Sequence, residues 1–287
     1  MTDAPASRRV SLRAKFWGLA LVVPALVLGV WLAVPLLRRE TPLIDAIAYS
    51  AGTPQAAGLV GFRDVTVTTP DGQRLDAWWA PPPAPGRGVV LLLHGNPGTI
   101  VHTAGPLADL QHAGLGAMAI DYRGFGRSTG RPSERGLRID ARAAFDWLRR
   151  AAPRSKIAVF GESLGTYPAV ALASERPVAG VLLNAPFASL RRLWMIRGLP
   201  SDRWLTIDPF DSRALIGRID APLLILEGSA DDIVPLGEAE RLFAAARPPK
   251  RMIIVQGAGH MAAYRGAAQA QALAALVRWT GGVDAGR

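Results

Sequence analysis

Two stretches of the sequence match the pattern G-x-S-x-G, in which a serine stands two residues from a glycine on either side. One match, GRSTG, is centred on Ser128, and the other, GESLG, is centred on Ser163. When this pattern joins a strand to a helix through a sharp turn, it exposes the serine hydroxyl for nucleophilic attack on a carbonyl carbon. Such a serine also needs a base that accepts its proton and a carboxylate that orients the base.

The segments around the two serines distinguish them. Ser163 follows the apolar run KIAVF, which is typical of a strand, and precedes TYPAVALASE, which can form a helix. Ser128 lies in DYRGFGRSTGRPSE, which indicates a wide loop because it combines several glycines with a proline. Since the chemistry requires a strand-turn-helix context, we predict Ser163 as the nucleophile and Ser128 as a loop serine without a catalytic role.

The base and the acid are expected after Ser163 in the chain, because serine enzymes with this strand-turn-helix unit use the order serine, acid, histidine. One of the four histidines, His260 in QGAGHM, follows Ser163, and we predict it as the general base. The loop SADDIVP after the apolar run PLLILEG offers two acids, Asp231 and Asp232. We prefer Asp231 as the acid that orients His260.

Two N–H donors complete the predicted site. A tetrahedral intermediate carries an oxyanion, which preorganised N–H groups stabilise. We expect these donors to be the main-chain N–H groups of Leu164, which follows the nucleophile, and of Asn96, in the loop HGNPG. His94 in the same loop precedes the serine, and we interpret it as a structural residue.

Eight segments of the chain read as strands. The first two, DVTVTT and QRLDAWWA, flank a Pro-Asp-Gly turn and predict a hairpin. The other six are VVLLLH, GAMAID, KIAVFG, VAGVLLNA, APLLILEG and RMIIVQG. Helices or long loops separate them, which predicts an α/β fold with a mostly parallel eight-stranded sheet and helices on both faces. The chemistry of such sheets lies in loops at the carboxyl ends of the strands.

The N-terminal segment predicts a membrane anchor. Residues 16–37 are 22 uncharged residues, which as a helix would span roughly 33 Å, against about 30 Å of hydrocarbon in a bilayer. A cleaved signal peptide is one alternative, although its apolar region is usually shorter, and a buried core helix is the other. Four basic residues precede the segment and two follow it. The positive-inside rule then predicts a single-pass protein with a cytoplasmic N-terminus and the catalytic domain on the outer, periplasmic or extracellular, side.

The composition of the chain excludes cysteine chemistry and argues against a nucleic-acid partner. The chain has 287 residues, a formal net charge of +10 and no cysteine, which excludes disulfides, cysteine metal sites and a cysteine nucleophile. Basic residues are not interleaved with aromatic ones in the main body, so we expect no nucleic-acid partner. The predicted segments are a basic tail (1–15), an anchor (16–37), a linker (38–60) and one domain (61–282).

The five motifs HGNPG, DYRGFGRSTGRPSE, GESLG, GSADDIVP and GAGH, in this order, resemble the α/β-hydrolase superfamily, and most of all its membrane-anchored ABHD-type branch. The resemblance covers roughly residues 58–280. It implies the α/β-hydrolase fold and a Ser-His-Asp triad that needs no metal or organic cofactor. It also places Asp231, not Asp232, at the acid position of the motif. A short lid is expected at about 187–219, between the sixth and seventh strands.

The resulting hypothesis is a membrane-anchored serine hydrolase that cleaves a small-molecule or lipid-like acyl ester, or a thioester, through an acyl-enzyme. Two alternatives use the same fold: a non-catalytic, membrane-tethered binding protein and an aminopeptidase-like hydrolase. A cofactor-free perhydrolase is a third. The sequence leaves open the physiological substrate, the acyl-chain length, the preference among ester, thioester and amide bonds, the oligomeric state and the final orientation of the anchor.

Overall fold

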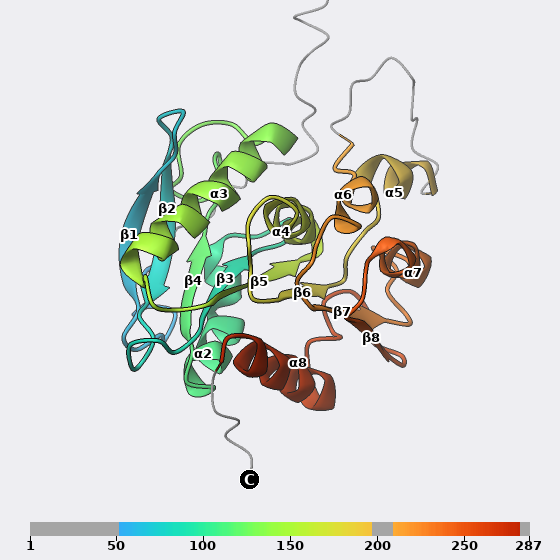
Figure 1. Cartoon of the computed structure of the whole chain (residues 1–287). Coiled ribbons are helices and arrows are strands. Elements are labelled where there is room, and N and C mark those ends of the chain that lie inside the picture. The colour runs from blue at the N-terminus through green and yellow to red at the C-terminus, as the bar shows by residue number, and fades with distance from the viewer. Residues whose placement is uncertain (1–51, 197–208, 282–287) are drawn as a thin grey trace, which may run out of the picture. The chain divides into compact units, whose positions relative to one another are not determined.

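The computed structural model describes residues 52–196 and 209–281. Eight strands form one sheet in the order β1-β2-β4-β3-β5-β6-β7-β8 (Figure 1). The strands are β1 (Arg63–Thr68), β2 (Arg74–Ala80), β3 (Val89–Leu93), β4 (Gly116–Ile120), β5 (Ile157–Glu162), β6 (Val181–Asn184), β7 (Leu223–Gly228) and β8 (Lys250–Val255). The predicted number of strands is therefore confirmed.

The sheet is mixed in direction. Strands β1 and β2 form the predicted antiparallel hairpin, and β2 also pairs antiparallel with β4. From β4 onward all neighbouring strands are parallel. The expectation of a mostly parallel sheet thus holds for β3 to β8. The antiparallel exception arises because a hairpin returns its second strand in the opposite direction.

Helices cover both faces of the sheet (Figure 1). Their bounds are α2 (Ala104–His112), α3 (Glu134–Ala151), α4 (Thr166–Ala173), α5 (Leu190–Ile196), α6 (Ser212–Ile216), α7 (Leu236–Ala245) and α8 (Gly266–Trp279), with short 3₁₀ turns η1 (Ile100–Thr103) and η2 (Ser163–Gly165). One core contains buried side chains of α3, α4, α6 and α7, and the other contains buried side chains of α2 and α8. The sheet is therefore buried on both faces, which is typical of parallel α/β sheets.

Strand β3 shows why the sequence forms this layer. Its residues Val89 and Leu91 belong to the core with α3 and α4, whereas Val90 and Leu92 belong to the core with α2 and α8. Successive side chains of a strand point to opposite faces, so a strand covered on both sides needs an uninterrupted apolar run. The run VVLLL meets this requirement, and all five residues are buried.

Helix α3 begins and packs as its sequence pattern indicates. Ser133 is the N-cap, and its side chain accepts a hydrogen bond from the N–H of Gly136, which satisfies one of the first free donors of the helix. Leu137, Ala141, Ala144 and Leu148 are buried on one face. This spacing of three to four residues is the amphipathic period of a helix that covers a sheet.

Several predicted segments lie partly or wholly outside the described residues. Within residues 52–196 and 209–281, no helix is long and apolar enough to cross a membrane. The predicted tail (1–15) and anchor (16–37) lie outside these ranges, so the anchor stays a prediction. The predicted lid, about 187–219, is described only at its two ends, which contain α5 and α6.

Candidate active site

Four loops meet at one edge of the sheet. Strands β3, β5, β7 and β8 run parallel, so their carboxyl ends lie on the same side. The loops after these ends carry Asn96, Ser163, Asp231 and His260 respectively. The topology alone therefore gathers the residues predicted from the sequence, as expected for sheets of this class.

Ser163 lies at the predicted sharp turn between β5 and α4. Its φ of 47° is positive, a conformation that is costly for a residue with a side chain and that surrounding packing must maintain. The two flanking glycines allow this packing. A Cβ at Gly161 would lie 2.6 Å from the carbonyl oxygen of Gly165, and a Cβ at Gly165 would lie 2.0 Å from the carbonyl oxygen of Leu93. The G-x-S-x-G pattern is thus required here by steric contact.

A continuous chain of hydrogen bonds links the serine, the histidine and the acid. His260 Nε2 lies 3.1 Å from Ser163 Oγ, and His260 Nδ1 lies 2.7 Å from Asp231 Oδ2. The structure brings Asp231 to His260, whereas the neighbouring Asp232 is exposed. In this arrangement His260 can accept the serine proton on one nitrogen while the carboxylate orients the other.

The carboxylate of Asp231 is held in its charged form. Burial by itself would raise the pKa of Asp231, but the hydrogen bonds to His260 and to the main-chain N–H groups of Val234 and Ile233 outweigh burial, so this pKa lies below its usual value. Both N–H groups donate to Oδ1 at 2.8 Å. Hydrogen bonds to the ionised form stabilise it. Asp231 is therefore an anion placed beside the imidazole.

The loop after β3 lies against the serine. A Cβ at Gly95 would lie 3.1 Å from Ser163 Cβ, and Asn96 lines the same cavity as Ser163 and His260. Leu164 occupies the first turn of a helical segment, where main-chain N–H groups have no acceptor within the helix. Asn96 and Leu164 thus belong to the two segments next to the serine from which the predicted N–H donors would come.

His94 is the first residue of this loop and is buried. Its Nδ1 lies 2.8 Å from the carbonyl oxygen of Gly95, and its Nε2 lies 3.4 Å from Asp121 Oδ1. Its ring also packs against Tyr122, with 4.5 Å between the ring centroids. These contacts hold the loop that carries Asn96, which agrees with the structural role predicted for His94.

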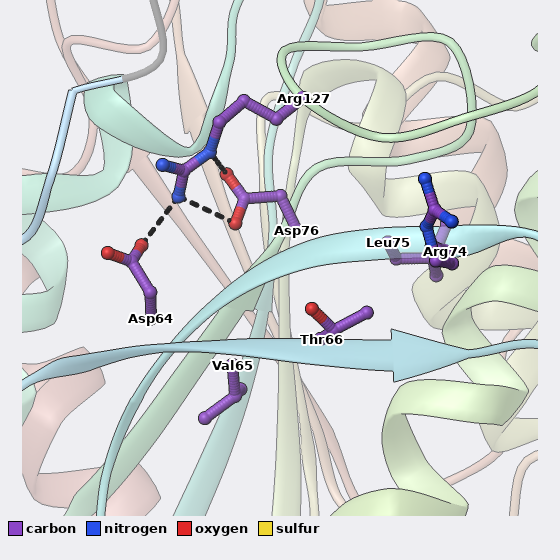
Figure 2. A pocket seen from close by; sticks show the side chains of 7 residues that line it. All are labelled: Asp64, Val65, Thr66, Arg74, Leu75, Asp76 and Arg127. Carbon is purple, nitrogen blue, oxygen red and sulfur yellow. Dashed lines mark hydrogen bonds and ion pairs between the residues drawn. The ribbon is translucent and has the colours of Figure 1, made fainter.

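Ser128 belongs to a different region. Its hydroxyl donates to the carbonyl oxygen of Asp121 at 2.7 Å and accepts the N–H of Asp76 at 2.8 Å. Beside it, Arg127 bridges Asp76 and Asp64 in a surface pocket of about 350 Å³ over β1 and β2 (Figure 2). In the sheet order, β4 and β3 lie between these strands and β5. Ser128 therefore fastens a loop to the hairpin, and its match to the pattern has no strand-turn-helix context.

The cavity at the serine has a volume of about 570 Å³. Ser163, His260 and Asn96 are among the residues that line it. The remaining wall includes polar side chains, among them His102, Asp109, Tyr264, Arg265 and Gln269. Gln269 Nε2 donates to Asp109 Oδ2 at 2.6 Å, which cross-links α8 to α2 at the cavity wall. The cavity can therefore hold a carbonyl group at the serine while other parts of the same molecule contact these polar side chains.

Two buried carboxyl groups near the site were not predicted from the sequence. Glu162 precedes the serine, and burial raises its pKa to about 7. Glu227 precedes the acid loop, and burial, together with the Asp231 carboxylate, raises its pKa to about 8. A single glutamate at the end of an apolar strand, as in LLILEG, is the signal that could have pointed to them, because buried charged residues are rare.

Comparisons with known proteins place the chain in a family. Its sequence matches the model described as alpha/beta hydrolase fold over residues 88–206. An uncharacterized protein of Mycobacterium tuberculosis (strain H37Rv), Rv2307c, is 44% identical over 218 residues, which cover 74% of this chain and 77% of that protein. The lysophosphatidylserine lipase ABHD12 of Macaca fascicularis is 29% identical over 298 residues, which cover 86% of this chain and 75% of the lipase.

Solved structures agree with this placement at the level of the fold. The esterase Pf2001 of Pyrococcus furiosus aligns with a TM-score of 0.67 at 21% identity, covering 80% of this chain and 95% of the esterase. Acetyl xylan esterase 1 of Thermoanaerobacterium aligns with a TM-score of 0.61 at 19% identity, covering 76% and 83% respectively. Sequence, relatives and fold together show that this chain belongs to the α/β-hydrolase superfamily, as a member of the ABHD type.

Proposed function

We propose that the chain is a serine hydrolase that cleaves carboxylic esters through a Ser-His-Asp triad. The observation that carries this proposal is the continuous hydrogen-bond chain from Ser163 through His260 to Asp231. A binding protein on the same fold would not require these three side chains to be aligned with a strained serine backbone. Relatives that are named as a lipase and as esterases support ester hydrolysis as the reaction class.

In the first half of the proposed reaction, Ser163 Oγ attacks the ester carbonyl carbon while His260 Nε2 takes the hydroxyl proton. The imidazolium that forms is stabilised by the Asp231 carboxylate. The carbonyl oxygen becomes an oxyanion, which the main-chain N–H groups of Asn96 and Leu164 would stabilise. The intermediate then collapses, the bond to the alcohol oxygen breaks, and His260 gives its proton to the leaving alcohol. The product is an acyl-enzyme at Ser163.

In the second half, water attacks the acyl-enzyme and gives its proton to His260. The bond to Ser163 Oγ then breaks, and the carboxylic acid leaves as the serine recovers its proton. A thioester would follow the same path with a thiol as leaving group, because the chemistry at the carbonyl carbon is the same. Water attack on the intermediate needs no group beyond the residues already named.

We propose in addition that residues 16–37 tether this hydrolase to a membrane, with the catalytic domain on the outer side. The length and apolarity of the segment support the anchor, and the excess of basic residues before it supports the orientation. Protease treatment of intact cells or spheroplasts tests the orientation. Digestion of the domain without cell lysis is expected, and complete protection would contradict the proposed side.

The catalytic proposal is tested by treating the full-length, detergent-solubilised protein with a fluorophosphonate and locating the adduct by peptide mass spectrometry. An adduct is expected on Ser163 and is expected to disappear in Ser163→Ala. Ser128→Ala is the matched control, since Ser128 occupies the other G-x-S-x-G match and is expected to leave labelling intact. Far-UV circular dichroism verifies that each variant is folded. An unlabelled but folded wild-type protein would overturn the triad proposal.

A further inference from the structure

Glu227 lies in β7, at the strand end that leads into the acid loop, and its side chain is fully buried. One carboxyl oxygen, Oε1, accepts the N–H of Gly228 at 2.9 Å. The other oxygen, Oε2, is buried and meets no hydrogen-bond donor in the described part of the chain. A buried carboxylate oxygen without a donor is costly. Such an oxygen is satisfied more readily if it carries a proton and becomes a donor itself.

The acceptor for such a proton is close. Asp231 lies in the turn directly after Glu227, where its N–H donates to the carbonyl oxygen of Gly228 at 3.3 Å. The charge of the Asp231 carboxylate and a side-chain hydrogen bond to it are among the causes that raise the pKa of Glu227. Asp231 is committed to the charged form, because His260 and two main-chain N–H groups bind its oxygens. Two carboxylates in contact inside a protein do not both ionise readily, and one retains its proton. Hydrogen-bond donors already stabilise the charged form of Asp231, so Glu227 is the carboxyl group that retains the proton.

We propose that Glu227 is a positioning residue for the triad: as a neutral carboxylic acid it donates its Oε2–H to the Asp231 carboxylate and thereby orients Asp231 toward His260. The catalytic consequence of this hydrogen bond rests on the proposed serine-hydrolase function, whereas the protonation of Glu227 does not. Glu227 acts on the reaction through Asp231 and His260 and has no contact of its own with the serine.

The electrostatic surroundings agree with this assignment. Burial is the largest cause that raises the pKa of Glu227 to about 8, the hydrogen bond from Gly228 opposes it, and the Asp231 carboxylate raises it further. The strand partner of Glu227 in β8 is the uncharged Ile254. Among the described residues, Asp231 is the charged group that acts on the pKa of Glu227, and His260 in turn binds Asp231. Glu227 is neutral at pH 7 and loses its proton on the alkaline side.

The experiment compares the pH dependence of fluorophosphonate inactivation in the wild type, Glu227→Gln and Glu227→Leu, all full-length. Above about pH 8 the wild type is expected to react more slowly, because an ionised Glu227 repels Asp231 and no longer donates to it. The glutamine amide donates at every pH, so Glu227→Gln is expected to lose this alkaline fall. Leucine cannot donate, and Glu227→Leu is expected to react about 10-fold more slowly at all pH values.

A second readout detects the proton without using activity. Infrared spectra of the wild type at increasing pH are expected to show a protonated-carboxyl band that disappears near pH 8 and that is absent in Glu227→Gln. Glu162→Gln is the matched control, because it removes a different buried carboxyl, whose pKa is about 7, and is expected to leave the Glu227 band in place.

The possible outcomes separate the two proposals. A band that titrates with Glu227, together with an alkaline fall that Glu227→Gln abolishes, supports the positioning role. An alkaline fall unchanged in Glu227→Gln, or the absence of the band at any pH, overturns it. If the wild type does not react with the fluorophosphonate at any pH while the band is present, the serine-hydrolase proposal fails and the protonation of Glu227 stands.

Discussion

The buried carboxyl of Glu162 makes the stability of this protein depend on pH, and Glu162→Gln isolates the effect. Glu162 is 7% exposed and directly precedes the proposed nucleophile. Burial is the largest influence and raises its pKa from 4.5 to about 7, although a hydrogen bond to Asn184 and the electrostatic interaction with His94 act in the opposite direction. The folded protein therefore holds a proton that the unfolded chain releases near pH 4.5.

The sign and size of the effect follow from this difference. Between pH 4.5 and about 7 the folded state binds more protons than the unfolded state, so the free energy of unfolding decreases as pH rises. The stabilisation is fully present below the unfolded pKa and is lost as pH rises through the folded pKa. A difference of about 2.5 pKa units corresponds to about 3 kcal/mol, of which about 2–3 kcal/mol falls between pH 5 and pH 8.5. Glutamine carries no titrating proton and lacks this contribution.

The assay is urea unfolding of the wild type, Glu162→Gln and the control Glu240→Gln at about pH 5 and about pH 8.5. Between the lower and the higher pH, the free energy of unfolding of the wild type is expected to fall by about 2–3 kcal/mol more than that of Glu162→Gln. Glu240 is exposed on α7, so Glu240→Gln is expected to follow the wild type at both. Glu227 lowers the free energy of unfolding with rising pH in all three proteins alike, so its contribution cancels in the comparison. A constant difference between the wild type and Glu162→Gln would refute the reasoning.

Three further predictions follow from the structure. Asp231→Asn is expected to reduce ester hydrolysis about 10⁴-fold, because the imidazole loses its anionic partner, as measured by kcat. Gly165→Ala is expected to destabilise the protein by about 3 kcal/mol in urea unfolding, because its Cβ would lie 2.0 Å from a carbonyl oxygen of β3. Asp140→Ala is expected to lower the free energy of unfolding by about 3–5 kcal/mol, since it removes the buried partner of Arg123. Its control is Asp220→Ala, which removes one partner of an exposed ion pair and should lower the free energy of unfolding by less than about 1 kcal/mol.

The proposed catalytic residues could be predicted from the sequence because each one follows a recognisable strand. Apolar runs such as KIAVF and PLLILEG are long enough to define strands that are buried on both faces, and the loops after them carry Ser163 and Asp231. The same local reading separated Ser163 from Ser128, since only the former has a strand before it and a helix after it. Each of these features depends on residues that are close together in the chain, so it can be recognised from the sequence.

The order and direction of the strands could not be predicted in the same way. In the sheet, β4 lies between β2 and β3, and β2 runs against both of its neighbours. Pairing depends on which apolar faces pack together over the whole sheet, and no single segment contains this information. Likewise, the sequence predicted only the extent of the lid, about 187–219, between two strands. It did not predict the two short helices, α5 and α6, that the structure describes near its ends.

The sequence by itself therefore determined which residues are candidates for chemistry, and the tertiary structure decided whether they meet. Ser163 and His260 are separated by 97 residues, and His260 and Asp231 by 29, yet their side chains lie within hydrogen-bonding distance. This alignment depends on parallel strands that end at one edge and on glycines that allow close contact. The burial of Glu227 beside Asp231 was decided at the same level, because a side chain loses water only when neighbouring strands and helices close around it.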